Sequence, residues 1–255
     1  MIRGYLYKLA RSPLTYIGVL GVFAVCLANL RGLLITPDTT VMDRIDLFID
    51  LDAFRKLTVI FAAVPFTANF ADEWKNRVTA YCVTRKGVKK YAASNVLLCA
   101  VTSFLALFLG ILLYMLVMSF FVDFDTPGKY VGDTGYPYCE LYTYGPRWLY
   151  PIIRVFIFSV SGSMWCVMGL MLSAFVPNKY VAVCSPVVAS YVVERITMQL
   201  PVKFSLYSLS VSFPLIYNSV VTFIYTTMFF TVISAVCGFV FYFVLRKRVR
   251  NEFTA

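Results

Sequence analysis

The chain contains no histidine among its 255 residues. Histidine is the commonest metal ligand and the usual general base near neutral pH, so its absence excludes Ser-His hydrolases and intramembrane metalloproteases. The 7 cysteines form no CxxC pair. No GxxxxGK[ST] phosphate loop is present either, because the only Gly-Lys pair is Gly128-Lys129. We therefore predict no catalytic residue, no metal site and no bound cofactor in this chain.

Charged residues are scarce at 14%, whereas 60% of the residues are hydrophobic. Soluble domains average roughly 45–50% apolar residues, and a bilayer core of roughly 30 Å needs about 20 mostly apolar residues as a helix. The sequence has six apolar runs, of which the first two are short and need flanking residues or a tilt. These runs are Leu14–Leu30, Phe54–Phe70, Ala92–Val122, Trp148–Val176, Tyr180–Leu200 and Val220–Leu245.

This pattern predicts an all-α integral membrane protein with six transmembrane helices. The segments between the runs are too short to hold a separate soluble domain, so residues 1–255 are interpreted as a single transmembrane domain. No A-x-A-like cleavage site follows the first run. We interpret that run as a retained first span rather than a signal peptide.

Basic residues concentrate in alternate connections of this topology, and acidic residues concentrate in the others. Because positive loops stay in the cytoplasm, the pattern predicts a multi-pass protein of a bacterial-type plasma membrane with both termini cytoplasmic. The net charge of +10 is then a topology signal rather than an indication of nucleic-acid binding. A simpler alternative is that these charges only orient the helices and contact anionic lipid. The predicted cytoplasmic basic residues outside the N-terminal segment are Lys75, Arg77, Arg85, Lys86, Lys89, Lys90, Lys179, Arg246, Lys247, Arg248 and Arg250.

Three shorter segments have predicted structures of their own. Residues 1–13 mix basic and apolar positions and are predicted to form an interfacial helix that Pro13 separates from the first span. Pro65 is expected to kink the second span. Residues 201–219 are too broken to span and too apolar for a solvated loop, which favours a re-entrant segment before the last helix.

Away from the ends of the predicted spans, three charged residues lie inside them. Arg154 and Glu194 each lie six residues from the outer ends of neighbouring spans, so at about 1.5 Å per residue they reach the same depth. We expect them to pair, and we expect Arg195 to face a polar cavity or to extend outward. Buried membrane charges line substrate routes or fix helix register, and the sequence leaves both roles open for Arg154 and Glu194.

Residues 72–91 form the most distinctive cytoplasmic segment. An acidic pair is followed by a short amphipathic stretch, in which Val78, Tyr81 and Cys82 share one side, and then by a basic turn. Gly87 is suited to the C-terminus of a helix.

This segment resembles the type-2 ATP-binding-cassette (ABC) exporter permeases, and the architecture of the whole chain agrees with that resemblance. The residues that carry it are Phe70, Glu73, Val78, Thr79, Val83, Thr84, Arg85, Gly87 and Tyr91. The resemblance implies that a second permease copy or a homologue completes the membrane unit, and that two cytoplasmic ABC ATPase subunits bind ATP and Mg. It also implies that residues 72–91 contain a coupling helix. The residues expected to couple to the ATPase are Glu73, Arg77, Val78, Tyr81, Cys82, Arg85 and Lys86.

The expected function is the membrane-spanning subunit of an ATP-driven exporter. The many aromatic residues, 23 Phe and 18 Tyr, suit an amphipathic or apolar substrate such as a peptide, lipid or drug, although they also suit simple membrane packing. The alternative is an ion-coupled secondary carrier or a membrane-embedded accessory protein that acts without an ATPase. A carrier favours inverted repeats and midplane carboxylates, but no repeat is evident and Glu194 is the only acid inside a predicted span.

Overall fold

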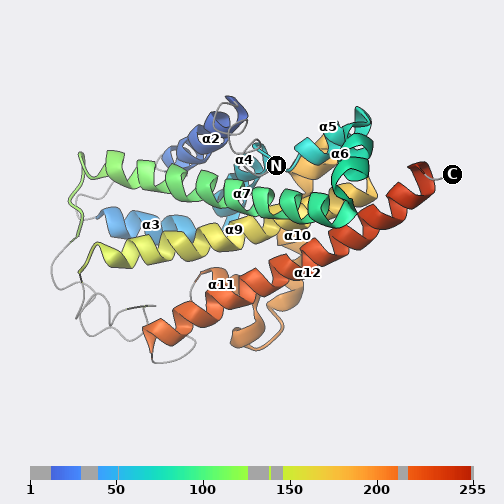
Figure 1. Cartoon of the computed structure of the whole chain (residues 1–255). Helices are drawn as coiled ribbons and strands as arrows, with labels where there is room; N and C mark the ends of the chain where they lie inside the picture. Colours follow the sequence, from blue (N-terminus) through green and yellow to red (C-terminus); the bar gives the residue numbers. More distant parts are fainter. Residues whose placement is uncertain are drawn as a thin grey trace.

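The computed structural model describes residues 13–29, 40–50, 52–125, 138, 146–211 and 218–253. This part of the chain contains helices and their connections and no β-strand, which confirms the all-α prediction (Figure 1). The predicted interfacial helix lies outside the described residues except for Pro13, where the first described helix begins, as expected.

Three helices are long and apolar enough to cross a membrane: α7 (Val88–Met118), α9 (Leu149–Phe175) and α12 (Ser219–Phe253). Helix α9 packs against both of the others and is the most buried of the three. At about 1.5 Å per residue, the 31 residues of α7 extend beyond a hydrocarbon core of about 30 Å. The fold therefore has the apolar framework of a membrane protein.

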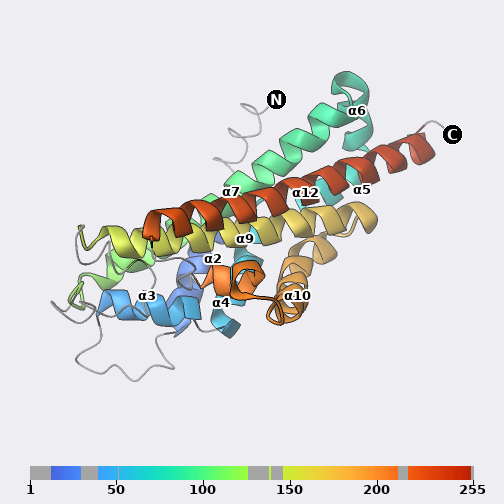
Figure 2. The same cartoon turned by 90° about the horizontal axis from the view of Figure 1, so that it is seen from below.

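The remaining predicted spans correspond to shorter helices. Helix α2 (Pro13–Asn29) packs against α7 and α4 (Asp52–Ala63), and α10 (Lys179–Thr197) packs against α9. Figure 2 shows α3, α4, α10 and α11 on one side of the three long helices. The six-span topology stays a prediction.

The second predicted span differs from the expected single kinked helix. Helix α4 ends at Ala63, a run of turns covers residues 64–68, and α5 (Asn69–Lys75) begins after it. Pro65 has no backbone N–H, and its ring clashes with the preceding helical turn. The sequence predicted a kink at this proline, whereas in the structure the helix ends there.

Helix α3 (Val41–Asp50) covers one end of α9. Its start is fixed by a reciprocal cap, in which the Asp43 amide donates to the Thr40 hydroxyl at 3.2 Å and the Thr40 amide donates to the Asp43 carboxylate at 3.1 Å. Phe48 packs edge-on against Phe158 of α9, with ring centroids 6.0 Å apart. This helix carries acidic side chains into contact with α9.

The segment before the last helix is only partly described. It contains the short turn η1 (Val202–Phe204) and helix α11 (Leu206–Ser210), whose Leu206 and Leu209 are buried. Helix α11 packs against α9 and α10. The segment is therefore held against the protein, and its re-entry into a membrane stays a prediction.

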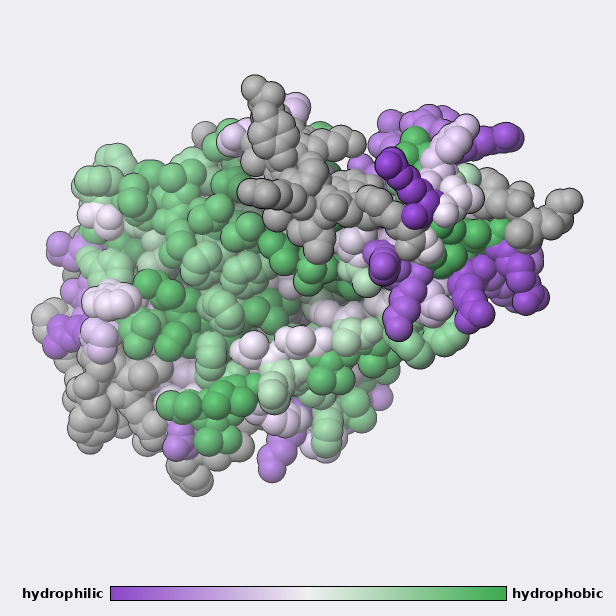
Figure 3. Space-filling view, viewed as in Figure 1, coloured by the Kyte–Doolittle hydropathy of each residue, from purple (hydrophilic) through white to green (hydrophobic). Residues whose placement is uncertain are grey.

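Hydrophilic residues gather over α5, α6 (Val78–Lys86) and the end of α12 (Figure 3). The Arg248 side chain holds this end together, because it donates to the Phe175 carbonyl at 2.9 Å and lies 5.6 Å above the Trp74 ring. The exposed basic residues of α5, α6, the turn between them, the start of α7 and the end of α12 are Lys75, Arg77, Arg85, Lys89, Lys90, Arg246, Lys247 and Arg250.

Candidate functional site

Within the segment 72–91, two sharp turns separate helix α6 from the helices before and after it. Arg77, with φ 58°, separates α5 from α6, and Gly87, with φ 78°, separates α6 from α7. Glycine reaches positive φ at little cost, whereas a residue with a Cβ does not. Gly87 therefore ends α6 as predicted, and α6 becomes a nine-residue helix at one end of the molecule (Figure 2).

A buried hydrogen-bond network attaches this helix to α7. The Tyr91 hydroxyl donates to the Glu73 carboxylate at 2.6 Å and lies 3.4 Å from the Thr79 hydroxyl. The Asn69 side-chain amide donates to the other Glu73 oxygen at 2.8 Å. Tyr91 and Thr79 are fully buried. Residues of α5, α6 and α7 thus meet at one carboxylate.

This network places Glu73 away from the exposed face of α6. The sequence places it among the residues that contact a partner, but its side chain is buried and points to Tyr91. The Glu73 carboxylate accepts a hydrogen bond from the buried Tyr91 hydroxyl, as buried polar groups in native proteins require. Glu73 is therefore a positioning residue for α6.

The outer face of α6 carries apolar and basic side chains together. Tyr81 is 76% exposed and Val78 is 41% exposed, and Arg77 and Arg85 beside them are exposed too. Cys82 is half-buried and packs against the core instead. The Lys86 side chain lies outside the described residues.

We expect Tyr91→Phe to destabilise the protein by about 1.5–3 kcal/mol, because it removes a hydrogen bond to a charged group in a buried site. Thermal unfolding of the purified chain in detergent measures the change. The matched control is Tyr81→Phe, which removes an exposed hydroxyl from the same segment and should stay within about 0.5 kcal/mol. Equal stability of the two variants would show that the Tyr91 hydroxyl does not hold α6.

A second arrangement lies deeper in the bundle around Arg154 of α9. Its guanidinium donates to Asp46 at 3.0 Å, approaches Asp50 at 3.5 Å and donates to the Val211 carbonyl. The Tyr150 hydroxyl donates to Asp46 at 3.0 Å. Burial raises the pKa of the Asp46 carboxyl, and the adjacent Arg154 opposes that rise.

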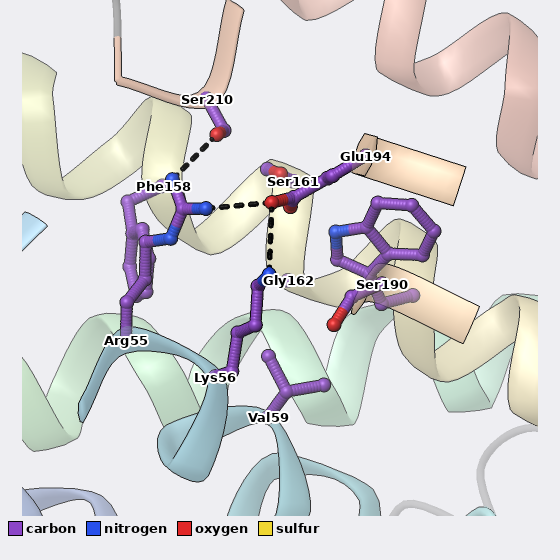
Figure 4. A pocket seen from close by; sticks show the side chains of 10 residues that line it. Arg55, Lys56, Val59, Phe158, Ser161, Gly162, Ser190, Glu194 and Ser210 are labelled. Carbon is purple, nitrogen blue, oxygen red and sulfur yellow. Dashed lines mark hydrogen bonds and ion pairs between the residues drawn. The ribbon is translucent and has the colours of Figure 1, made fainter. Parts of the chain in front are cut away.

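Glu194 of α10 has different partners, both from α4. It accepts a hydrogen bond from Arg55 at 2.7 Å and lies 3.4 Å from the Lys56 ammonium. Arg55 also donates to the Ser210 hydroxyl at 2.8 Å (Figure 4). All three charged side chains are buried.

The predicted Arg154–Glu194 pair is therefore wrong. Both residues are buried in adjacent helices, but α3 supplies the partners of Arg154 and α4 supplies those of Glu194. The two networks meet instead at the end of α11, where Ser210 and Val211 each accept from one arginine. Arg195 is exposed, and its guanidinium contacts the Met198 sulfur at 3.9 Å.

Sequence reasoning missed Arg55, Lys56, Asp46 and Asp50 as site residues, because they precede or begin the second predicted span and were interpreted as loop charges. One signal was available. Asp46 and Asp50 are four residues apart, so both lie on one face of a helix, and their neighbours Ile45, Phe48 and Ile49 are apolar.

The described residues thus define an all-helical protein with three apolar helices of membrane-crossing length, a basic helix at one end and two buried ion-pair networks. No group of three or more His, Cys, Asp or Glu side chains in this part of the chain is arranged to hold a metal ion. Comparison with protein-family models, curated proteins and solved structures finds no match.

Proposed function

We propose that this chain is the membrane-spanning permease subunit of an ATP-driven exporter of the ABC type, with α6 as the helix that docks on a separate ATPase. The observation that carries the proposal is the exposed face of α6. Tyr81 and Val78 expose apolar surface there, and Arg77 and Arg85 are exposed on the same short segment. Aromatic anchors surrounded by charges are typical of protein interfaces.

The attachment of α6 supports a role in transmitting motion. Glu73, Thr79 and Tyr91 join α5, α6 and α7 in one buried network. A displacement of α6 would therefore act on the 31-residue helix α7 directly. Arg248 extends the connection to α12 and α9 through Trp74 and the Phe175 carbonyl.

The complete proposal follows the resemblance. Six spans place both termini and α6 in the cytoplasm of a bacterial-type cell. A second permease copy or a homologue completes the pathway, and two ATPase subunits supply ATP hydrolysis with Mg. The substrate is an amphipathic or apolar molecule that moves outward.

Co-purification tests the proposal against a carrier that acts alone. The full chain, extracted from its native membrane in a mild detergent, should bring down a soluble subunit with a GxxxxGK[ST] phosphate loop, and ATP hydrolysis should accompany it. A chain that transports its substrate after reconstitution without any ATPase would contradict the proposal and favour the ion-coupled alternative.

We further expect opposite accessibility of the two ends of α7. In a cysteine-free background, Asp123→Cys should react with a membrane-impermeant maleimide on intact cells, whereas Lys89→Cys should react only after the cells are opened. Both original side chains are exposed, so differences in burial do not explain the result. The reverse pattern would invert the proposed topology.

A further inference from the structure

The exposed face of α12 changes from apolar to basic within one helical turn. Phe239 and Phe243 are 63% and 48% exposed, and the exposed residues Arg246 and Lys247 follow them. Residues three or four positions apart lie on the same face of a helix. This face of α12 therefore carries aromatic rings and then, directly after them, two cations.

Helix α7 shows the same pattern at its start. Lys89 and Lys90 are exposed there, and the exposed positions Ala93 and Leu97 follow at a spacing of three or four residues. None of the four cations on α7 and α12 makes an ion pair with another described residue. We call these four residues the basic band: Lys89, Lys90, Arg246 and Lys247.

The two halves of the basic band lie at the same level of the molecule. Gly238 of α12 packs closely against Val96 of α7, because a Cβ at Gly238 would lie 2.9 Å from the Val96 side chain. Lys89 precedes this contact by seven residues, which is about 10 Å of helix, and Arg246 follows it by eight residues, about 12 Å. Both halves lie at the end of the molecule that carries α5 and α6 (Figure 2).

The apolar surface next to the basic band has the thickness of a bilayer core. Residues 93–116 of α7 and 220–243 of α12 each extend over about 35 Å, which is close to the hydrocarbon core of roughly 30 Å. The exposed side chains in both stretches are apolar except for Thr231, whose hydroxyl donates to the Thr227 carbonyl at 2.7 Å. A bilayer that covers these stretches would place its headgroups at the basic band.

The charge of this end of the molecule selects the type of headgroup. Asp72 is the only exposed acid among the described side chains of α5, α6, the first turn of α7 and the last turns of α12. Each Lys or Arg near a membrane surface favours an anionic lipid by about fivefold, whereas a zwitterionic headgroup carries its own cation. We propose that the basic band binds the phosphate groups of acidic phospholipids, such as phosphatidylglycerol.

The proposal requires a chain embedded in a membrane but no ATPase partner. Lys89 lies two residues after Gly87, where α6 ends, so headgroups bound at the basic band would lie at the base of α6. Lipid binding would then fix the depth at which α6 leaves the membrane, because α7 continues directly from it. This role adds to the proposed docking function of α6 without depending on it.

Native mass spectrometry of the full chain in detergent measures the affinity for single added lipids. We expect dioleoyl phosphatidylglycerol to bind more tightly than dioleoyl phosphatidylcholine. Arg246→Gln/Lys247→Gln should weaken phosphatidylglycerol binding by at least about fivefold, and Lys89→Gln/Lys90→Gln should do the same. Phosphatidylcholine binding should not change in either variant, and this also checks the fold, since all four side chains are exposed.

The matched control is Arg147→Gln/Arg195→Gln, which removes two exposed positive charges outside the basic band. Its affinity for phosphatidylglycerol should stay within about twofold, because charges beyond a Debye length are screened. Equal losses in the band and control variants would show that binding follows net charge alone. Unchanged lipid affinity in both band variants, combined with lost association of a soluble protein, would assign the cations to that protein. Either result would overturn the proposal, whereas a missing ATPase with intact lipid selectivity would contradict only the proposed function.

Discussion

Arg154→Met should lower the free energy of unfolding by about 3–5 kcal/mol, because it leaves the buried Asp46 carboxylate without its cation. Asp46 would keep only the Tyr150 hydroxyl among its described donors, and the Val211 carbonyl would lose the Arg154 donor. Chemical unfolding of the purified chain in a defined detergent measures the change. No other single substitution proposed for this protein removes as many buried polar contacts.

The control for this prediction is Arg147→Met. Arg147 also pairs with an aspartate, Asp125 at 3.3 Å, but its side chain is 50% exposed. Exposed ion pairs contribute about 0–1 kcal/mol, so the loss should be small. Adding Asp46→Asn to Arg154→Met should recover part of the lost stability, because the two groups are coupled. If the two arginine variants are equally stable, the buried network does not stabilise the fold.

Tyr81→Asp should abolish association with the ATPase while the permease still folds and inserts. The ring is 76% exposed in the isolated chain, so the substitution removes little internal packing. At an interface, truncating an aromatic anchor weakens binding by at least about 30-fold, and the new carboxylate adds repulsion from acidic groups that would face Arg77 and Arg85. Co-purification of the ATPase with membrane-inserted variant measures the effect.

Tyr180→Asp provides the matched control. Tyr180 lies in the first turn of α10 and is 71% exposed, so the same chemical change is made on a different element. We expect this variant to retain the ATPase. Arg85→Gln should slow association only mildly, because rim charges act mainly on the encounter rate. Full ATPase binding by Tyr81→Asp would contradict the docking role of α6 and remove the main support for an ABC permease.

The positions of several helix boundaries were predictable from local signals. Pro13 begins α2 and Gly87 ends α6, because proline suits the first turn of a helix and glycine suits its C-terminus. The long apolar runs predicted α7, α9 and α12. Helix ends and apolar runs depend on residues that are close together in the sequence, so they can be predicted without the tertiary structure. The complete break at Pro65 was underestimated as a kink, because the surrounding turn residues carry no strong signal of their own.

The partners of the buried charges were decided by the tertiary structure. Arg55 and Glu194 are 139 residues apart in the chain, and Arg154 and Asp46 are 108 residues apart. Equal depth in neighbouring helices suggested an Arg154–Glu194 pair, but partner choice also depends on how each helix is rotated and on which third element packs beside it. The same reason explains Glu73, whose inward direction depends on the position of Tyr91 on α7.

The sequence by itself thus determined an all-helical chain with long apolar helices and the grouping of its basic residues, because periodicity and composition are local properties. Only the tertiary structure decided that α6 is held by a buried carboxylate and that two separate ion-pair networks meet at Ser210 and Val211. Those features require residues from several helices to approach within a few ångströms, and packing, rather than local pattern, sets that approach.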